Sequence, residues 1–183
     1  MMKRFNRMDR KGVLHYITLN VREKMKAFSR DEYARAILRQ LHEQCIRHPA
    51  KLIAYVIMPE HLHAILNPRD GRINHFLSQF KSAASLTAEA IAHQYGHPRI
   101  LQWLANTPDG HRQFLQDGKH DFHLYSDRLI WQKINYIHNN PIKRGLVQHA
   151  EDYLYSSFAP MYKTGKEVIV PIDEDWWWDL GLE

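Results

Sequence analysis

The sequence predicts an α+β fold in which helices pack mainly on one face of an antiparallel sheet. Segments rich in β-branched and aromatic residues alternate with longer segments in which apolar residues recur at helical spacing. Two of the strand segments are separated only by Pro59 and Glu60, which predicts a tight hairpin. The chain has 183 residues and shows no internal repeat or linker. We therefore expect a single domain over residues 1–183, with residues 160–183 as a Trp-rich C-terminal tail.

The first half of the chain supplies three predicted strands and one helix. Residues 13–20 predict the first strand, and residues 52–58, apolar on both faces, predict a central second strand. The third strand, residues 62–67, completes the hairpin. Ser29 and Glu32 form a capping-box pattern, so we expect a helix to begin there. Its predicted buried stripe consists of Ala34, Ile37, Leu38, Leu41 and Cys45.

The second half predicts two further helices and a weaker strand. Asn74 is expected to cap a helix that runs to about His93, and Ser126 to cap a helix over residues 127–140 that Pro141 ends. Between them, residues 100–104 predict a short packed segment, and residues 111–124 a strand interrupted near residues 117–118. The order β-α-β-β-α-β-α suits a ferredoxin-like sandwich.

Charge and composition narrow the classes of partner. Lys and Arg number 25 against 20 for Asp and Glu, an excess compatible with a polyanion such as nucleic acid. No apolar run approaches the ~20 residues of a membrane span, and the basic N-terminus has no apolar region of a secretory signal after it. The one cysteine, Cys45, cannot form an internal disulfide. We expect a cytoplasmic protein with no membrane partner, associated with the nucleoid when bound to DNA.

The candidate site begins with His61 and His63. Residues two apart in a strand point to the same face, so the two imidazoles form a possible pair of metal ligands. The alternative is coincidence, since the chain has 13 histidines. No set of cysteines exists for a structural zinc, and a mixed imidazole and oxygen site suits Mg²⁺ or Mn²⁺.

A later helix carries a possible nucleophile. Tyr136 and Asn140 are four apart, so they are neighbours on one helix face. A tyrosine can attack a phosphodiester and keep the bond energy in a phosphotyrosine linkage, while the Asn140 amide oxygen could serve the same metal. The alternative is that Tyr136 is an ordinary aromatic, one of nine tyrosines.

Residues 58–66, 134–147 and 152–157 together resemble the REP-associated tyrosine transposases, single-tyrosine members of the HUH (His–hydrophobic–His) endonuclease superfamily that are related to the smallest insertion-sequence transposases. The resemblance covers about residues 11–160. It implies a divalent metal held by His61, His63 and Asn140, and Tyr136 as the nucleophile on a helix beside the sheet. The implied substrate is single-stranded DNA folded into an imperfect hairpin. The implied reaction is cleavage to a 5′-phosphotyrosine and a free 3′-OH, followed by strand transfer or rejoining without ATP.

The resemblance also bears on DNA contacts and assembly. Lys143 and Arg144 after the tyrosine helix, and Lys81 on the second helix, are expected to contact phosphates, with ordinary surface charge as the alternative. A monomer is favoured, although related enzymes form dimers with swapped tyrosine helices. Residues 99–111 look longer and more irregular than the family pattern. Trp176, Trp177 and Trp178 lie outside the resemblance and are expected to staple the tail to the body, with base stacking as the alternative.

Two other functions compete with this interpretation. One is a catalytically silent hairpin-binding regulator of the same fold, and the other is an unrelated metal-dependent phosphodiesterase in which Tyr136 only packs. The favoured interpretation makes a geometric demand. The face of the third strand that bears both imidazoles must look at the Tyr136 side of the later helix, or a partner subunit must supply that helix.

Overall fold

The structure, a computed structural model, describes residues 12–105, 113–118 and 122–175. Its sheet consists of β1 (Leu14–Val21), β2 (Ala50–Met58), β3 (His61–Pro68), β4 (Leu115–Asp117) and β5 (Phe122–Leu124). The strand order is β2-β3-β1-β4, β5 also pairs with β1, and every pairing is antiparallel. The helices are α1 (Asp31–Arg47), α2 (Ile73–Gln94), α3 (Pro98–Ala105), α4 (Asp127–Lys143) and α5 (Phe158–Tyr162). Short 3₁₀ turns occupy Arg22–Lys24, Ala27–Ser29 and Ala150–Asp152.

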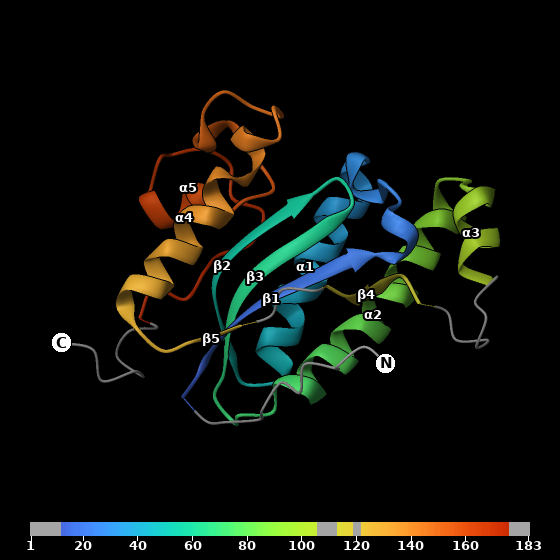
Figure 1. Cartoon of the computed structure of the whole chain (residues 1–183). Helices are drawn as coiled ribbons and strands as arrows, with labels where there is room; N and C mark the ends of the chain where they lie inside the picture. The colour runs from blue at the N-terminus through green and yellow to red at the C-terminus, as the bar shows by residue number, and fades with distance from the viewer. Residues whose placement is uncertain (1–11, 106–112, 119–121, 176–183) are drawn as a thin grey trace.

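Helices cover both faces of the sheet, α1 and α2 on one and α4 on the other (Figure 1). Alternation along β1 explains the two cores, because Ile17 and Leu19 pack with α1 and α2 whereas Tyr16 packs with α4. On α4 the inward stripe consists of Ile130, Ile134 and Ile137, as the helical spacing predicted. The predicted α+β antiparallel sheet with the tyrosine helix beside it is confirmed.

The predicted helix starts have mixed outcomes. Ser126 is the N-cap of α4, and its Oγ accepts a hydrogen bond from the Leu129 N–H at 3.4 Å. The capping box at Ser29 is wrong, because Ser29 belongs to the preceding 3₁₀ turn and Arg30 is the N-cap without a side-chain bond. Asn74 is also wrong as a cap, since it lies within the first turn of α2, which follows Arg72.

The prediction that Pro141 ends the tyrosine helix is wrong as well. Pro141 lies inside α4, which continues to Lys143. A proline in the last turn removes only one N–H, and the final carbonyls still find donors, since the Arg144 N–H bonds the Asn140 carbonyl and the Gly145 N–H bonds that of Ile142. The predicted interrupted strand is present as β4 and β5, with residues 119–121 between them outside the described residues.

The edge of β2 that does not pair with β3 is covered by the C-terminal part of the chain. The Ile57 N–H donates to the Tyr155 carbonyl, the Ser157 N–H to the Tyr55 carbonyl, and the Leu52 N–H to Asp173 Oδ2 at 2.8 Å. Covering an edge strand prevents its pairing with another chain. The predicted role of Trp176–Trp178 falls outside the described residues. Within the described part of the chain, no helix combines the length and apolarity needed to cross a bilayer.

Candidate functional site

His61 and His63 stand together on the face of β3 that looks toward α4. Their ring centroids are 4.6 Å apart, whereas Leu62 between them is buried in the core on the opposite face. In the antiparallel pairing with β1, Thr18 lies opposite His63 and Asn20 opposite His61. The alternation of strand residues therefore places both imidazoles and their cross-strand neighbours on one surface.

Tyr136 reaches this surface from α4. Its ring centroid is 5.6 Å from that of His63 and 6.3 Å from that of Tyr16, and both contacts are edge-on. The side chain remains 40% exposed, so a large substrate can reach it. The geometric demand made by the sequence is met within one chain, since β3 and α4 of the same molecule bring His63 and Tyr136 into contact.

The ring of His63 is held by two hydroxyl groups of β1. Its Nδ1 lies 2.8 Å from Tyr16 Oη and 3.0 Å from Thr18 Oγ1. An imidazole held at Nδ1 has its Nε2 as the atom with which to bind a ligand, the arrangement common among metal-binding histidines. Tyr16 is only 2% exposed. Of the two tyrosines beside His63, Tyr136 is therefore the accessible one.

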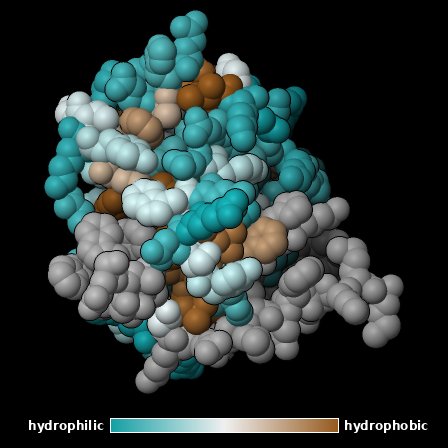
Figure 2. Space-filling view, turned by 60° about the vertical axis from the view of Figure 1, so that its left-hand side comes forward, coloured by the Kyte–Doolittle hydropathy of each residue, from teal (hydrophilic) through white to brown (hydrophobic). Residues whose placement is uncertain are grey.

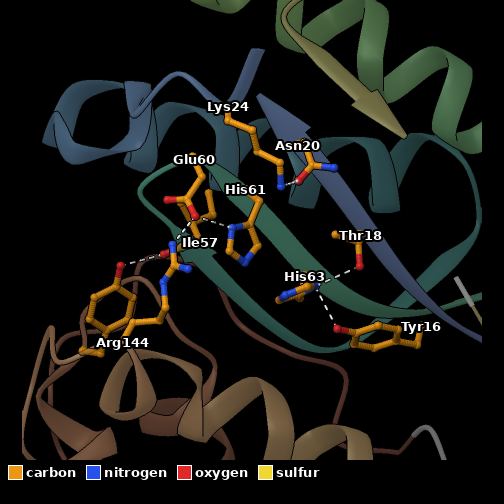
Figure 3. Close-up of polar contacts among 10 residues, drawn as sticks. Tyr16, Thr18, Asn20, Lys24, Ile57, Glu60, His61, His63 and Arg144 are labelled. Carbon is orange, nitrogen blue, oxygen red and sulfur yellow. Dashed lines mark hydrogen bonds and ion pairs between the residues drawn. The ribbon is translucent and has the colours of Figure 1, made fainter. Parts of the chain in front are cut away.

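His61 is held by a carboxylate. Its Nδ1 lies 3.2 Å from Glu60 Oε1, and the same oxygen is ion-paired with the Arg144 guanidinium (Figure 3). Burial lowers the pKa of His61, although the neighbouring Glu60 opposes this effect. The neutral imidazole is the form that binds metal ions, so burial favours the protonation state that a ligand needs.

Asn140 lies one helical turn after Tyr136 and is 7% exposed. Among the described residues, no three side chains drawn from His, Cys, Asp and Glu are grouped to hold a metal. A cation here would rest on the two imidazoles and a neutral oxygen such as that of Asn140. Such a sparse donor set leaves coordination positions for substrate oxygens, as an open site for a divalent ion requires.

Two lysines of α4 flank the Tyr136 ring. Lys143 Nζ lies 5.5 Å from its centroid and Lys133 Nζ 5.6 Å, and Lys133 also lies over the rings of Tyr16 and Phe122. Burial lowers the pKa of Lys133. Figure 2 brings forward the side of the molecule that carries α4 and α5, where hydrophilic residues dominate the described surface and hydrophobic ones form small separate patches. The two lysines beside Tyr136 place positive charge on this surface.

The predicted DNA contacts are not all brought to this site. Lys143 lies beside Tyr136. Arg144, the next residue after Lys143, forms an ion pair with Glu60. Lys81 lies on α2, on the opposite face of the sheet, and its Nζ is 3.1 Å from Asp117 Oδ1.

Sequence reasoning missed four residues of the site, namely Tyr16, Thr18, Glu60 and Lys133. Alternation in the first strand does place Tyr16 and Thr18 on one face, but only the pairing of β1 with β3 shows that they face His63. Glu60 was interpreted only as part of the turn between two strands, and Lys133 was not assigned to the site.

Comparisons with known proteins bear on the family and the fold of the chain. No family model matches the sequence. A curated Haemophilus influenzae protein described as "Putative REP-associated tyrosine transposase" is 24% identical over 177 residues, covering 96% of this chain and 93% of its own length. A solved structure of a REP-associated tyrosine transposase bound to a REP hairpin superposes with a TM-score of 0.67 at 19% identity, covering 92% of this chain and 90% of that one. In sequence over nearly its whole length, and in fold, the chain is thus similar to the REP-associated tyrosine transposases.

Proposed function

We propose that the chain is a metal-dependent single-strand DNA endonuclease and strand transferase that acts on hairpin-forming repeats. The observation that carries the proposal is the contact between the exposed Tyr136 and His63, one half of a histidine pair, within a single chain. A relative of the same fold was solved with a REP hairpin bound to it, which supports a hairpin as the substrate class.

Tyr136 would act as the nucleophile. Its phenolic oxygen attacks the phosphorus of a phosphodiester, the bond between phosphorus and the 3′ oxygen breaks, and the phenolic proton is formally transferred to the leaving 3′ oxygen. The products are a 5′-phosphotyrosine and a free 3′-OH. Attack by a 3′-OH on the phosphotyrosine reverses the step on the same or another strand. The energy of the broken bond stays in the linkage, so ATP is not required.

The other residues of the site would prepare this attack. His61, His63 and Asn140 would hold Mg²⁺ or Mn²⁺, and such an ion, when bound, polarises the phosphoryl oxygens. Tyr16 and Thr18 fix the ring of His63.

Positive side chains would hold the phosphate and the strand. Lys133 and Lys143 place positive charge beside the Tyr136 ring, which favours a bound phosphate and a forming phenolate. Lys143 is the best placed of the three predicted DNA contacts. Lys81 would meet DNA only by giving up or sharing its ion pair with Asp117, and Arg144 is already paired with Glu60.

We also propose that the protein works as a monomer. The histidine pair and the tyrosine come from one chain, and α4 is anchored to the sheet of that chain by its isoleucine stripe. A silent regulator of the same fold would show the hairpin binding without the chemistry.

The decisive experiment compares two tyrosines that touch the same histidine. The protein is incubated with Mn²⁺ or Mg²⁺ and a labelled single-stranded hairpin oligonucleotide, and the products are separated on denaturing gels. The wild type should form a labelled covalent adduct, and Tyr136→Phe should reduce it at least ~10³-fold because the nucleophile is gone. The matched variant Tyr16→Phe removes only a hydroxyl that holds His63, so its adduct should persist at a reduced rate.

The other outcomes identify the rival functions. Hairpin binding without cleavage or adduct in the wild type indicates a silent binding protein. Cleavage that survives Tyr136→Phe and yields no adduct indicates hydrolysis by water, and it would overturn the assignment of the nucleophile.

A further inference from the structure

Glu60 lies where three parts of the structure meet: the end of β1, the β2–β3 hairpin and the end of α4. It forms, with Pro59, the turn between β2 and β3. The Glu60 carbonyl accepts a hydrogen bond from the Val21 N–H at 2.9 Å, and the Pro59 carbonyl accepts one from the Phe28 N–H at 3.0 Å. The turn is therefore tied to the end of β1 and to the segment before α1. A side chain that starts from such a turn has a well-defined origin.

One oxygen of the Glu60 side chain connects β3 to the end of α4. Oε1 lies 3.2 Å from His61 Nδ1 and also pairs with the guanidinium of Arg144 (Figure 3). Arg144 is the C-cap of α4, and its backbone N–H donates to the Asn140 carbonyl at 3.1 Å. A continuous chain of contacts thus runs from Asn140 through Arg144 and Glu60 to His61.

The placement of this carboxylate is costly. Glu60 is 8% exposed, and among the described residues its second oxygen, Oε2, is buried without a hydrogen-bond partner. A buried carboxylate oxygen left without a partner opposes folding. The cost is understandable if the carboxylate serves the site rather than the stability of the fold.

The contact between Glu60 and His61 determines which nitrogen of His61 is available to bind a ligand. An ionised carboxylate only accepts hydrogen bonds, so the proton of the neutral imidazole must lie on Nδ1 and the lone pair on Nε2. In Figure 3 the second ring nitrogen of His61 points away from Glu60, on the side where His63 lies. The hydroxyls of Tyr16 and Thr18 hold His63 at the same ring position. Both imidazoles are therefore held at Nδ1.

We propose that Glu60 is a positioning residue, which fixes the His61 ring and tautomer for ligand binding and, through Arg144, holds the tyrosine helix against the β2–β3 hairpin. This role rests on the proposed function, since it gives the metal-holding half and the nucleophile half of the site a direct mechanical connection. It also assigns Arg144 primarily to the protein's own structure, in contrast to the phosphate contact predicted from sequence.

The test begins with the metal-free protein. Long-range ¹H–¹⁵N NMR spectra report which nitrogen of each imidazole carries the proton. The wild type should show His61 protonated at Nδ1, and Glu60→Ala should shift it toward the Nε2-protonated form, with Glu60→Gln intermediate because the amide retains an acceptor oxygen. His93, exposed on α2, is the internal reference in the same spectra. Circular dichroism confirms that each variant is folded.

Metal affinity and adduct formation then separate the two parts of the proposal. Titration with Mn²⁺ alone should show affinity about 10- to 100-fold weaker in Glu60→Gln, the usual effect of losing the partner of a ligating histidine. Arg144→Ala should leave Mn²⁺ affinity within a few-fold and lower adduct formation at saturating Mn²⁺. In the double variant Glu60→Gln/Arg144→Ala, the loss of adduct formation should be little greater than in Glu60→Gln alone, because both residues act through one contact. Arg128→Ala, exposed on the same helix, is the matched control and should change none of these.

The outcomes distinguish this inference from the proposed function. A wild-type tautomer at Nε2, or Mn²⁺ affinity and tautomer unchanged in Glu60→Gln, overturns the role of Glu60 whether or not the protein forms an adduct. If the tautomer and affinity change as expected but no hairpin gives an adduct, Glu60 still positions His61 and the proposed function fails. A third outcome is that Arg144→Ala weakens hairpin binding to the same extent in the wild type and in the Glu60→Gln variant. In that case Arg144 is a phosphate contact, and the connection to α4 is rejected.

Discussion

At the scale of single residues, His61 and Tyr136 carry different parts of the proposed chemistry, so their removal should have different consequences. His61 is largely buried and faces His63, whereas the positive charges beside Tyr136 come from Lys133 and Lys143. His61→Ala should therefore lower adduct formation at least ~100-fold, the upper range for damage to a ligand shell, and weaken hairpin binding less than about threefold. Gel-shift and adduct assays on the same samples measure both quantities.

Chelation provides the control for this prediction. EDTA added to the wild type should reproduce the phenotype of His61→Ala, and His93→Ala, an exposed histidine of α2, should change neither quantity. Equal losses of binding and adduct formation in His61→Ala would contradict a role confined to the metal.

The side-chain directions at the site were predictable, but their partners were not. The period of two along β3 was enough to place His61 and His63 together, and the helical period was enough to place Tyr136 beside Asn140. Glu60 was interpreted as part of a turn and Arg144 as a DNA contact, because their pairing joins residues 84 positions apart. A contact of that kind depends on how α4 docks on the hairpin, and no local pattern in the sequence encodes it.

At the scale of elements, the docking of α4 determines whether the site is built from one chain or two. Ile130, Ile134 and Ile137 are buried against Tyr16, Val56 and Ile65 of the same chain. We therefore expect that a mixture of Tyr136→Phe and His61→Ala, each inactive alone, forms no more adduct than either variant separately. The measurement is the hairpin adduct assay on pre-incubated mixtures. Restored adduct would show that one chain supplies its tyrosine helix to another, since each mixed dimer would then hold one intact site.

The ends of the elements show where sequence patterns are insufficient. Ser126 caps α4 as predicted, because the chain before it is extended and its hydroxyl can reach the Leu129 N–H. Ser29 has the same chemistry, but the turn Ala27–Ser29 makes Arg30 the first residue whose carbonyl enters α1. Pro141 did not end α4, because it removes only one N–H from the last turn and the Arg144 and Gly145 N–H groups still bond the Asn140 and Ile142 carbonyls. Capping motifs thus predict the presence of a helix better than its first residue.

At the scale of the whole molecule, the sheet and its cover come from distant parts of the chain. The hairpin of β2 and β3 followed from the sequence, and so did the antiparallel class. The cover of the β2 edge by residues 153–157 and by Asp173 did not, because an edge leaves no periodic signal in the segment that covers it. The C-terminal region is therefore part of the core. Val170 is buried there, and its carbonyl accepts a hydrogen bond from the Tyr55 hydroxyl.

Buried tyrosines should make the whole fold sensitive to alkaline pH. Tyr33 is fully buried between Phe114 and His97, and desolvation raises its pKa to about 12. The pKa is higher in the folded state than the ordinary value near 10, so this contribution to stability is complete below about pH 10. It is lost as the pH rises toward 12, because the unfolded chain releases the proton first. The free energy of unfolding should fall by on the order of 2 kcal/mol across this window from Tyr33 alone.

Urea unfolding at pH 9.5 and 11.5 measures the loss, which should be smaller in Tyr33→Phe and unchanged in Tyr125→Phe, whose side chain is exposed. An equal loss in wild type and Tyr33→Phe would mean that Tyr33 ionises as readily in the folded protein as in the unfolded chain.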